Sequence, residues 1–174
     1  MSTQSAVVPL AEPWLRGTHV DVPAVARGLL HALDLASEDL GKWTAGLTGT
    51  EVHDHPLGLP SISFHLKHIA RSVDRLLSYA EGKQLSIDQI HVLKSEQDGA
   101  EQLAILLAEV DVSFKQAAER VRALSVSDLE AFRGVGKKQL PTRVGGLLVH
   151  VADHTQRHVG QVVTTAKVLV GLRG

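Results

Sequence analysis

Hydrophobic positions recur every three or four residues over four long stretches of this sequence, which is the spacing of one buried face on an α-helix. These stretches predict helices at about residues 22–46, 61–81, 101–124 and 143–170. Asp21 and Pro23 suit the start of the first helix, and Ser61 and Gly82 suit the two ends of the second. Four long amphipathic helices in one chain predict an all-α four-helix bundle.

The segments outside these helices carry weaker patterns. Residues 1–20 contain proline and glycine breakers and are expected to form an irregular leader. Long connections join the second helix to the third and the third to the fourth. The first connection should contain a short helix at Ile87–Lys94. The second should contain a helical turn at 127–132, followed by an irregular loop over 134–141.

Composition narrows the class of protein. A chain of 174 residues with 44% hydrophobic residues suits one domain spanning residues 1–174, because no linker or repeat divides it. The net charge of -1 and the 3% aromatic content argue against a nucleic-acid partner, since no basic cluster or stacking surface is evident. The absence of cysteine excludes disulfides, cysteine-ligated zinc and a cysteine nucleophile.

The termini and apolar runs bear on localisation. The first residues lack a basic start followed by an apolar core, so no signal peptide is expected. No apolar run approaches the length needed to span a bilayer, so no membrane partner is expected either. A reducing compartment is compatible with a chain that has no cysteine. We therefore expect a cytoplasmic protein.

A row of histidines on the last predicted helix is the most informative feature. His150, His154 and His158 follow one another at intervals of four, so they share one helix face. Four residues rise about 6 Å along a helix and eight rise about 12 Å, whereas metal–imidazole bonds are only about 2.0–2.1 Å long. One metal ion can therefore take His150 with His154, or His154 with His158. Its third ligand could be His65 or His68 of the second helix.

Two stretches resemble the DinB/YfiT superfamily of four-helix metalloproteins. FHLKHIARSVDRLL (64–77) is similar to the histidine-bearing second helix of that superfamily, and HVADHTQRHVGQ (150–161) is similar to the H-x-x-x-H-x-G-Q signature of its last helix. EPWLRGTHVDVPAV (12–25) and LPTRVGGLLVH (140–150) also resemble a bacterial DinB-like branch. The resemblance covers nearly the whole chain.

The resemblance implies a metal site of three histidines, one from the second helix and two from the last. On this sequence they are His68, His154 and His158, because the Gly-Gln pair directly after His158-Val159 sets the register. His150 and His65 then lie beside the site as pocket residues. The superfamily often has arginine before the Gly-Gln pair, whereas this sequence has Val159 there, which slightly weakens the expectation of anion binding nearby.

Three imidazoles on one divalent ion leave a coordination position open, which suits catalysis better than a closed structural site. The ion is expected to be Zn²⁺ or Ni²⁺, with Fe²⁺ and Mn²⁺ as alternatives, because imidazole discriminates weakly among them. Arg71 and Arg75 follow His68 along the second helix and are candidates for contacting an anionic substrate. Ordinary ion pairs are the commoner role of such arginines.

The function that follows is a metal-dependent enzyme acting on a small molecule. The resemblance implies a transferase for low-molecular-weight thiols or a hydrolase, and a chain without cysteine is compatible with a thiol supplied by the substrate. The alternative is a non-catalytic metal-binding or stress-linked bundle protein. Homodimerisation is implied by the resemblance alone.

Overall fold

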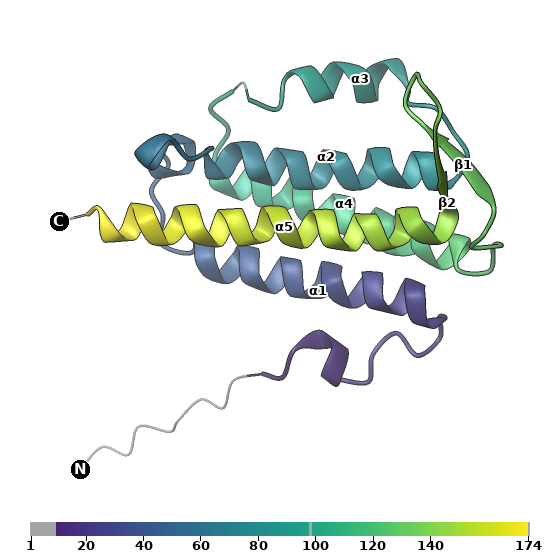
Figure 1. Cartoon of the computed structure of the whole chain (residues 1–174). Coiled ribbons are helices and arrows are strands. Elements are labelled where there is room, and N and C mark those ends of the chain that lie inside the picture. Colours follow the sequence, from purple (N-terminus) through teal and green to yellow (C-terminus); the bar gives the residue numbers. More distant parts are fainter. Residues whose placement is uncertain (1–9, 98, 174) are drawn as a thin grey trace, which may run out of the picture.

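The four hydrophobic stripes form four long helices that lie side by side (Figure 1). The computed structural model describes residues 10–97 and 99–173. Its long helices are α1 (Ala24–Thr44), α2 (Ile62–Ala80), α4 (Leu103–Leu124) and α5 (Val144–Gly171). The predicted all-α bundle is thereby confirmed.

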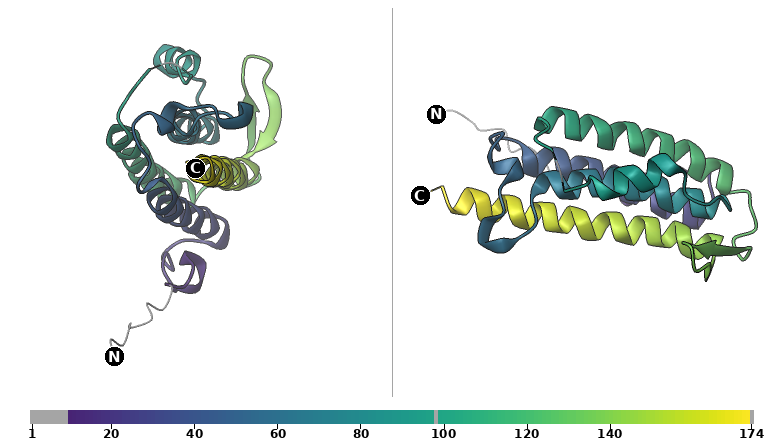
Figure 2. Two further views of the ribbon diagram at one scale, coloured as in Figure 1. Left: turned by 90° about the vertical axis from the view of Figure 1, so that its left-hand side faces the viewer. Right: turned by 90° about the horizontal axis from the view of Figure 1, so that it is seen from above.

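Helices α2 and α5 each pack extensively against two other long helices. Helix α2 contacts both α4 and α5, and α1 packs mainly against α5 (Figure 2). The core holds side chains from every long helix, and the largest of those that are fully buried include Leu29, Leu66, Ile69, Leu106 and Leu148. Helices α2 and α5 run in opposite directions (Figure 1). Their direct contact brings the histidine-bearing faces of the two helices together.

The long connection after α2 returns along the outside of the bundle. It contains α3 (Ile87–Lys94), which starts with a capping box in which the Ser86 side chain accepts from the Gln89 backbone and the Gln89 side chain accepts from the Ser86 backbone. Because the chain crosses back before α4 begins, α4 runs in the same direction as α2 (Figure 1). Residues 83–97 are called the strap below.

One buried residue joins the strap to the bundle. No residue of α3 itself is buried, but Glu96 just beyond it is only 4% exposed. The Arg75 guanidinium of α2 donates to Glu96 Oε1 through Nη1 at 2.6 Å, and Arg71 Nη1 donates more weakly to the Val92 carbonyl at 3.4 Å. The strap is therefore held by polar contacts to α2 rather than by apolar burial of its helix.

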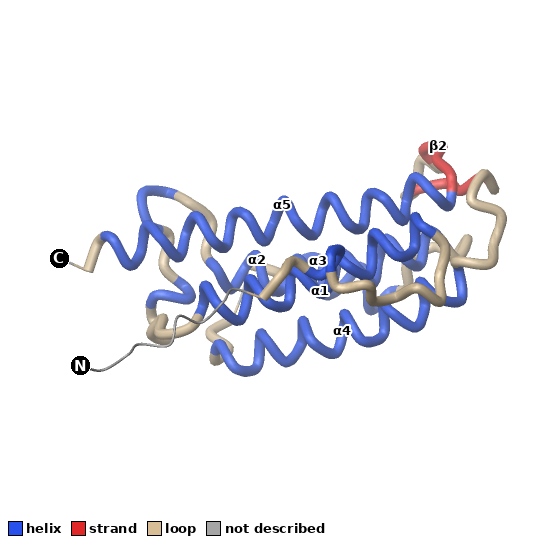
Figure 3. The backbone as a smooth tube through the Cα atoms, turned by 90° about the horizontal axis from the view of Figure 1, so that it is seen from below, coloured by secondary structure: helices blue, strands red, loops and turns tan. Residues whose placement is uncertain are grey.

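The connection between α4 and α5 differs from the prediction. Residues 127–132 contain only one short hydrogen-bonded turn, in which the Ala131 backbone donates to the Asp128 carbonyl at 3.1 Å. The segment 134–141 is no irregular loop, because β1 (Phe132–Val135) and β2 (Leu140–Arg143) pair as an antiparallel hairpin. The hairpin lies at the end of the bundle where α5 begins (Figure 3). The prediction is wrong here because glycine and proline do not always indicate a loop: proline is also tolerated in a short exposed edge strand.

Tertiary contacts stabilise this hairpin. Arg133 Nε donates to the Ala80 carbonyl at 2.7 Å, so it satisfies a backbone acceptor at the C-terminal end of α2. The backbone of Gly145 donates to the Leu129 carbonyl at 2.8 Å, at the start of α5. A Cβ atom at Gly145 would lie 3.3 Å from that carbonyl oxygen, which makes glycine the fitting residue.

The leader is described only from residue 10 onward, and residues 1–9 of the predicted irregular segment lie outside the described residues. Its described part contains a short 3-10 helix, η1 (Pro13–Leu15), which lies against α1. Two further 3-10 helices, η2 (Glu51–His53) and η3 (Pro56–Gly58), connect α1 to α2. Within residues 10–97 and 99–173, no helix combines the length and apolar composition needed to cross a membrane.

Glu96→Ala should release the strap and leave the four long helices folded. Removing one partner of a buried hydrogen-bonded pair costs about 1–3 kcal/mol, so amide hydrogen exchange in residues 83–97 should accelerate roughly ten- to a hundredfold. Glu119→Ala on α4 removes an exposed carboxylate away from the strap and serves as the control. Exchange in the strap that is equally slow in both variants would show that Glu96 does not hold it.

Candidate metal centre

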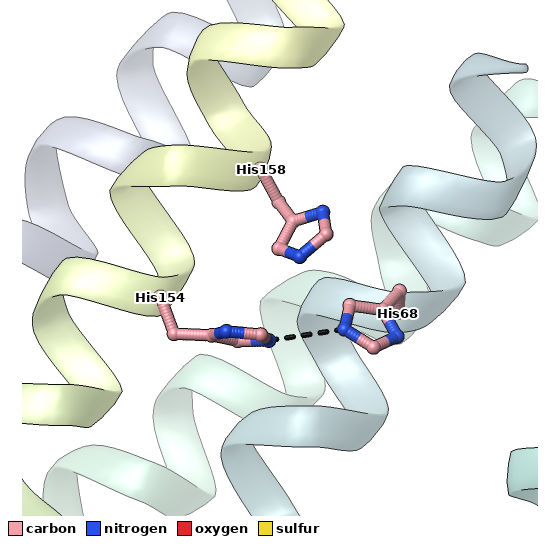
Figure 4. Close-up of side chains that lie close together, drawn as sticks. All are labelled: His68, His154 and His158. Atoms are coloured by element: carbon pink, nitrogen blue, oxygen red, sulfur yellow. Dashed lines mark hydrogen bonds between the residues drawn. The ribbon is translucent and has the colours of Figure 1, made fainter. Parts of the chain in front are cut away.

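Three histidines meet where α2 faces α5. His68 comes from α2, and His154 and His158 come from successive turns of α5. Each offers one ring nitrogen, and these three nitrogens all lie within 4.8 Å of one another. Figure 4 shows the three rings turned toward a common gap between the two helices.

The spacing of the rings fits one metal ion. His68 Nε2 and His154 Nε2 are 3.0 Å apart. The ring centroid of His158 lies 4.4 Å from that of His68 and 4.7 Å from that of His154. Nitrogens bound to one tetrahedral ion at the usual bond length are about 3.3 Å apart. The three nitrogens are therefore already close to the spacing that one ion requires.

Two of the three rings are oriented through their second nitrogen. His68 Nδ1 donates to Glu96 Oε2 at 2.7 Å, which directs His68 Nε2 toward the gap. His158 Nδ1 lies 3.0 Å from His65 Nδ1, which likewise leaves His158 Nε2 for the gap. Such a partner on the far nitrogen fixes the tautomer and orientation of a metal-binding imidazole. The arrangement therefore presents Nε2 of both rings to an ion.

His65 is the more unusual of these partners. It is 1% exposed, and among the described residues its Nε2 has no hydrogen-bond partner. If His158 keeps its hydrogen on Nδ1, His65 accepts it and must carry its own hydrogen on this unpaired Nε2. A buried polar atom without a partner costs about 1–3 kcal/mol. The core therefore tolerates an unfavourable histidine whose hydrogen-bond partner is His158.

The environment keeps His65, His154 and His158 neutral at pH 7. Burial, with a smaller contribution from neighbouring His68, lowers the pKa of His154 to about 4 and that of His158 to about 3. The same two causes lower the pKa of His65 to about 4. Only neutral imidazole can bind a metal ion. The site therefore holds His154 and His158 in the ligating form well below neutral pH.

Glu96 is charged despite its burial. Burial alone would raise the pKa of its carboxyl group, but hydrogen bonds from His68 and Arg75 more than offset this and hold the pKa below its ordinary value. Sequence analysis missed this residue. No local pattern marks it, because it is 28 residues from His68 in the chain and follows a short exposed helix.

The structure distinguishes between the histidine pairs that spacing alone leaves open. The nitrogens gathered with His68 belong to His154 and His158. His150 lies one turn away with its side chain 45% exposed, and its Nδ1 is 2.9 Å from Asp153 Oδ1. His65 lies behind His158 rather than in the gap. The set brought together is the one that the resemblance implies.

The two arginines considered for substrate binding are both neutralised. Arg75 pairs with Glu96, as described above. Arg71 Nε donates to Glu109 Oε1 of α4 at 2.8 Å. Each guanidinium therefore has a carboxylate partner within the bundle. Their observed role is to join α2 to the strap and to α4.

A comparison with known families adds to this geometry. A sequence model described as the DinB superfamily matches residues 32–162, well over half of the chain, and the matched segment contains all three histidines. The match confirms the resemblance seen in the two histidine-bearing stretches. No curated protein matches the chain.

His65→Leu should weaken metal binding while keeping the fold. Without His65, the Nδ1 atom of His158 loses its partner, and loss of such a partner typically costs about 10–100-fold in metal affinity. The measurement is a Zn²⁺ titration against a competing chelator, with circular dichroism to verify the helices. His150→Ala alters the same histidine row outside the triad and should bind Zn²⁺ as the unaltered protein does. An equal loss in both variants would contradict the role of His65.

Acid should destabilise the metal-free protein before its carboxylates are protonated. Unfolded histidines take up protons near pH 6.5, but His154 and His158 in the fold do so only near pH 4 and pH 3. The unfolded state therefore binds more protons between these values, and the free energy of unfolding falls as pH is lowered from 7 toward 4. Urea unfolding at several pH values in the presence of chelator measures this slope. The double variant His154→Gln/His158→Gln should flatten it, and an unchanged slope would contradict the assignment.

Proposed function

The chain belongs to the DinB superfamily, a superfamily of metal-binding proteins, and from this premise we propose that His68, His154 and His158 bind one divalent metal ion in an enzyme acting on small molecules. Zn²⁺ or Ni²⁺ is the proposed ion, with Fe²⁺ and Mn²⁺ as alternatives. The proposed reaction is transfer of a low-molecular-weight thiol to an electrophile, or a hydrolysis.

The convergence of three imidazoles, with no fourth protein ligand in the described group, carries this proposal. Structural zinc sites are normally closed by four protein ligands, whereas catalytic sites keep one position for water or substrate. When bound, a divalent ion supplies Lewis acidity, which lowers the pKa of water or of a thiol. The histidines are partly buried, so the gap is accessible to a small molecule.

The residues of the chain would hold this centre rather than react themselves. Glu96 directs His68 Nε2 toward the gap, and His65 directs His158 Nε2 toward the same place. No cysteine is present in the sequence, so a thiol nucleophile would have to come from the substrate. The cytoplasm as compartment and a homodimer as assembly remain predictions from the sequence, as does the absence of a nucleic-acid or membrane partner.

A non-catalytic role is the second candidate. Its support is that the three ligands come from two helices that pack against each other in the core, so an ion would also link α2 to α5. Under this alternative, removal of the metal should lower the melting temperature markedly and no substrate should be turned over. Under the enzyme proposal, the apolar core keeps the fold stable and activity depends on the ion.

Metal analysis and turnover together test the proposal. The purified, untagged protein should contain about one transition metal per chain, and His154→Ala/His158→Ala should contain none. His55→Ala/His91→Ala alters two exposed histidines outside the triad and should retain the metal. Screening thiols against electrophiles should then reveal turnover that His68→Ala abolishes while its helical content is unchanged. If neither the protein nor the control takes up metal after soaking with Zn²⁺ and Ni²⁺, the proposal is wrong.

A further inference from the structure

A cavity of about 270 Å³ directly borders the metal centre. His68 and His154 form part of its wall, so a molecule in the cavity contacts two of the three imidazoles. The rest of the wall is mostly apolar and comes from α2 and the strap, with His150 of α5 beside them. Its apolar surface comes from Leu76, Leu85, Leu93 and the ring of Tyr79.

The charges at this cavity cancel. Arg75 is the permanently charged side chain on its wall, and its Nη1 lies 2.6 Å from the carboxylate of Glu96. Both side chains are nearly buried, at 9% and 4% exposure, so solvent does not separate them. Glu96 also accepts from His68. The cavity therefore offers no unpaired positive charge that would offset the cost of moving an anion out of water.

The polar groups on the wall give no anion site either. Ser72 Oγ donates to the Ile69 carbonyl of its own helix at 3.2 Å. His150 pairs with Asp153, whose carboxylate would repel an anion. The remaining wall favours a group that gains by leaving water, as an aliphatic or aromatic group does.

From this lining we infer that the cavity binds an uncharged apolar part of the substrate, an aliphatic or aromatic group adjoining the reacting atom, and discriminates against anionic groups. The link to a reacting atom rests on the proposed function, whereas the preference of the cavity itself does not. The strap supplies Leu85 and Leu93, so one wall of the pocket depends on the segment that Glu96 holds in place.

The first experiment tests the cavity without metal. Benzyl alcohol and benzoate, matched in size but not in charge, are titrated into metal-free protein while backbone amide shifts are followed by NMR. Benzyl alcohol should cause saturable shifts at Leu85 and Leu93, and benzoate should cause none there. Leu93→Asp places a carboxylate in the wall and should weaken benzyl alcohol binding at least about tenfold. Leu93→Ala, which adds no charge, should weaken it less.

A matched control lies on the same short helix. Ile87 is 85% exposed and does not line this cavity, so Ile87→Asp introduces the same charge into α3 and should leave benzyl alcohol binding unchanged. Equal loss in Leu93→Asp and Ile87→Asp, or binding of benzoate as tight as that of benzyl alcohol, would overturn the inference.

The second experiment tests whether the cavity selects the thiols that bind at the metal centre. Zn²⁺-loaded protein is titrated calorimetrically with phenylmethanethiol, ethanethiol and mercaptoacetate. The aromatic thiol should bind at least about tenfold tighter than ethanethiol, and the carboxylate thiol should bind most weakly. A reversed order would overturn the inference. If no Zn²⁺ binds, the proposed function fails, and the metal-free titration still decides the preference of the cavity.

Discussion

The hydrogen bonds of the buried Glu96 carboxylate hold together the candidate metal centre and the strap. The carboxylate accepts from His68 through one oxygen and from Arg75 through the other, so one buried group orients a proposed ligand, neutralises an arginine and anchors the strap. Because these contacts share one carboxylate, the geometry of the centre and the charge of the adjoining cavity are coupled. Displacement of the strap would change both.

Burying the histidines of the centre is unfavourable, and close packing of the core does not require it. Burial depresses the pKa values of His65, His154 and His158, and His65 keeps a buried ring nitrogen without a partner among the described residues. Apolar side chains at these positions would stabilise a bundle more simply. Local violations of good packing are expected at functional sites, where the rest of the fold offsets them. The cluster is therefore better understood as a site than as part of the core.

The topology of the chain places this site at the edge of the bundle. Helices α2 and α5 meet directly, and the strap lies outside α2 because the chain returns along the bundle before α4 begins (Figures 1 and 2). The centre is therefore flanked by the hydrophobic core on one side and by the strap, which polar contacts hold to α2, on the other. That arrangement combines rigid ligand positions with access for a small molecule, which is what the proposed activity requires.

The sequence by itself determined the four helices and the faces they bury, since periodicity is a local property and α-helical spacing follows from it. It also determined that His150, His154 and His158 share one face, and the resemblance indicated His68 as their counterpart. Tertiary structure alone decided that His65 supports His158 across 93 residues and that Glu96 reaches His68 across 28. It also decided that Arg71 and Arg75 are neutralised, and that a hairpin between α4 and α5 replaces the expected loop. These features depend on contacts between segments far apart in the chain, and no local pattern of residue types records which partner a polar side chain will meet.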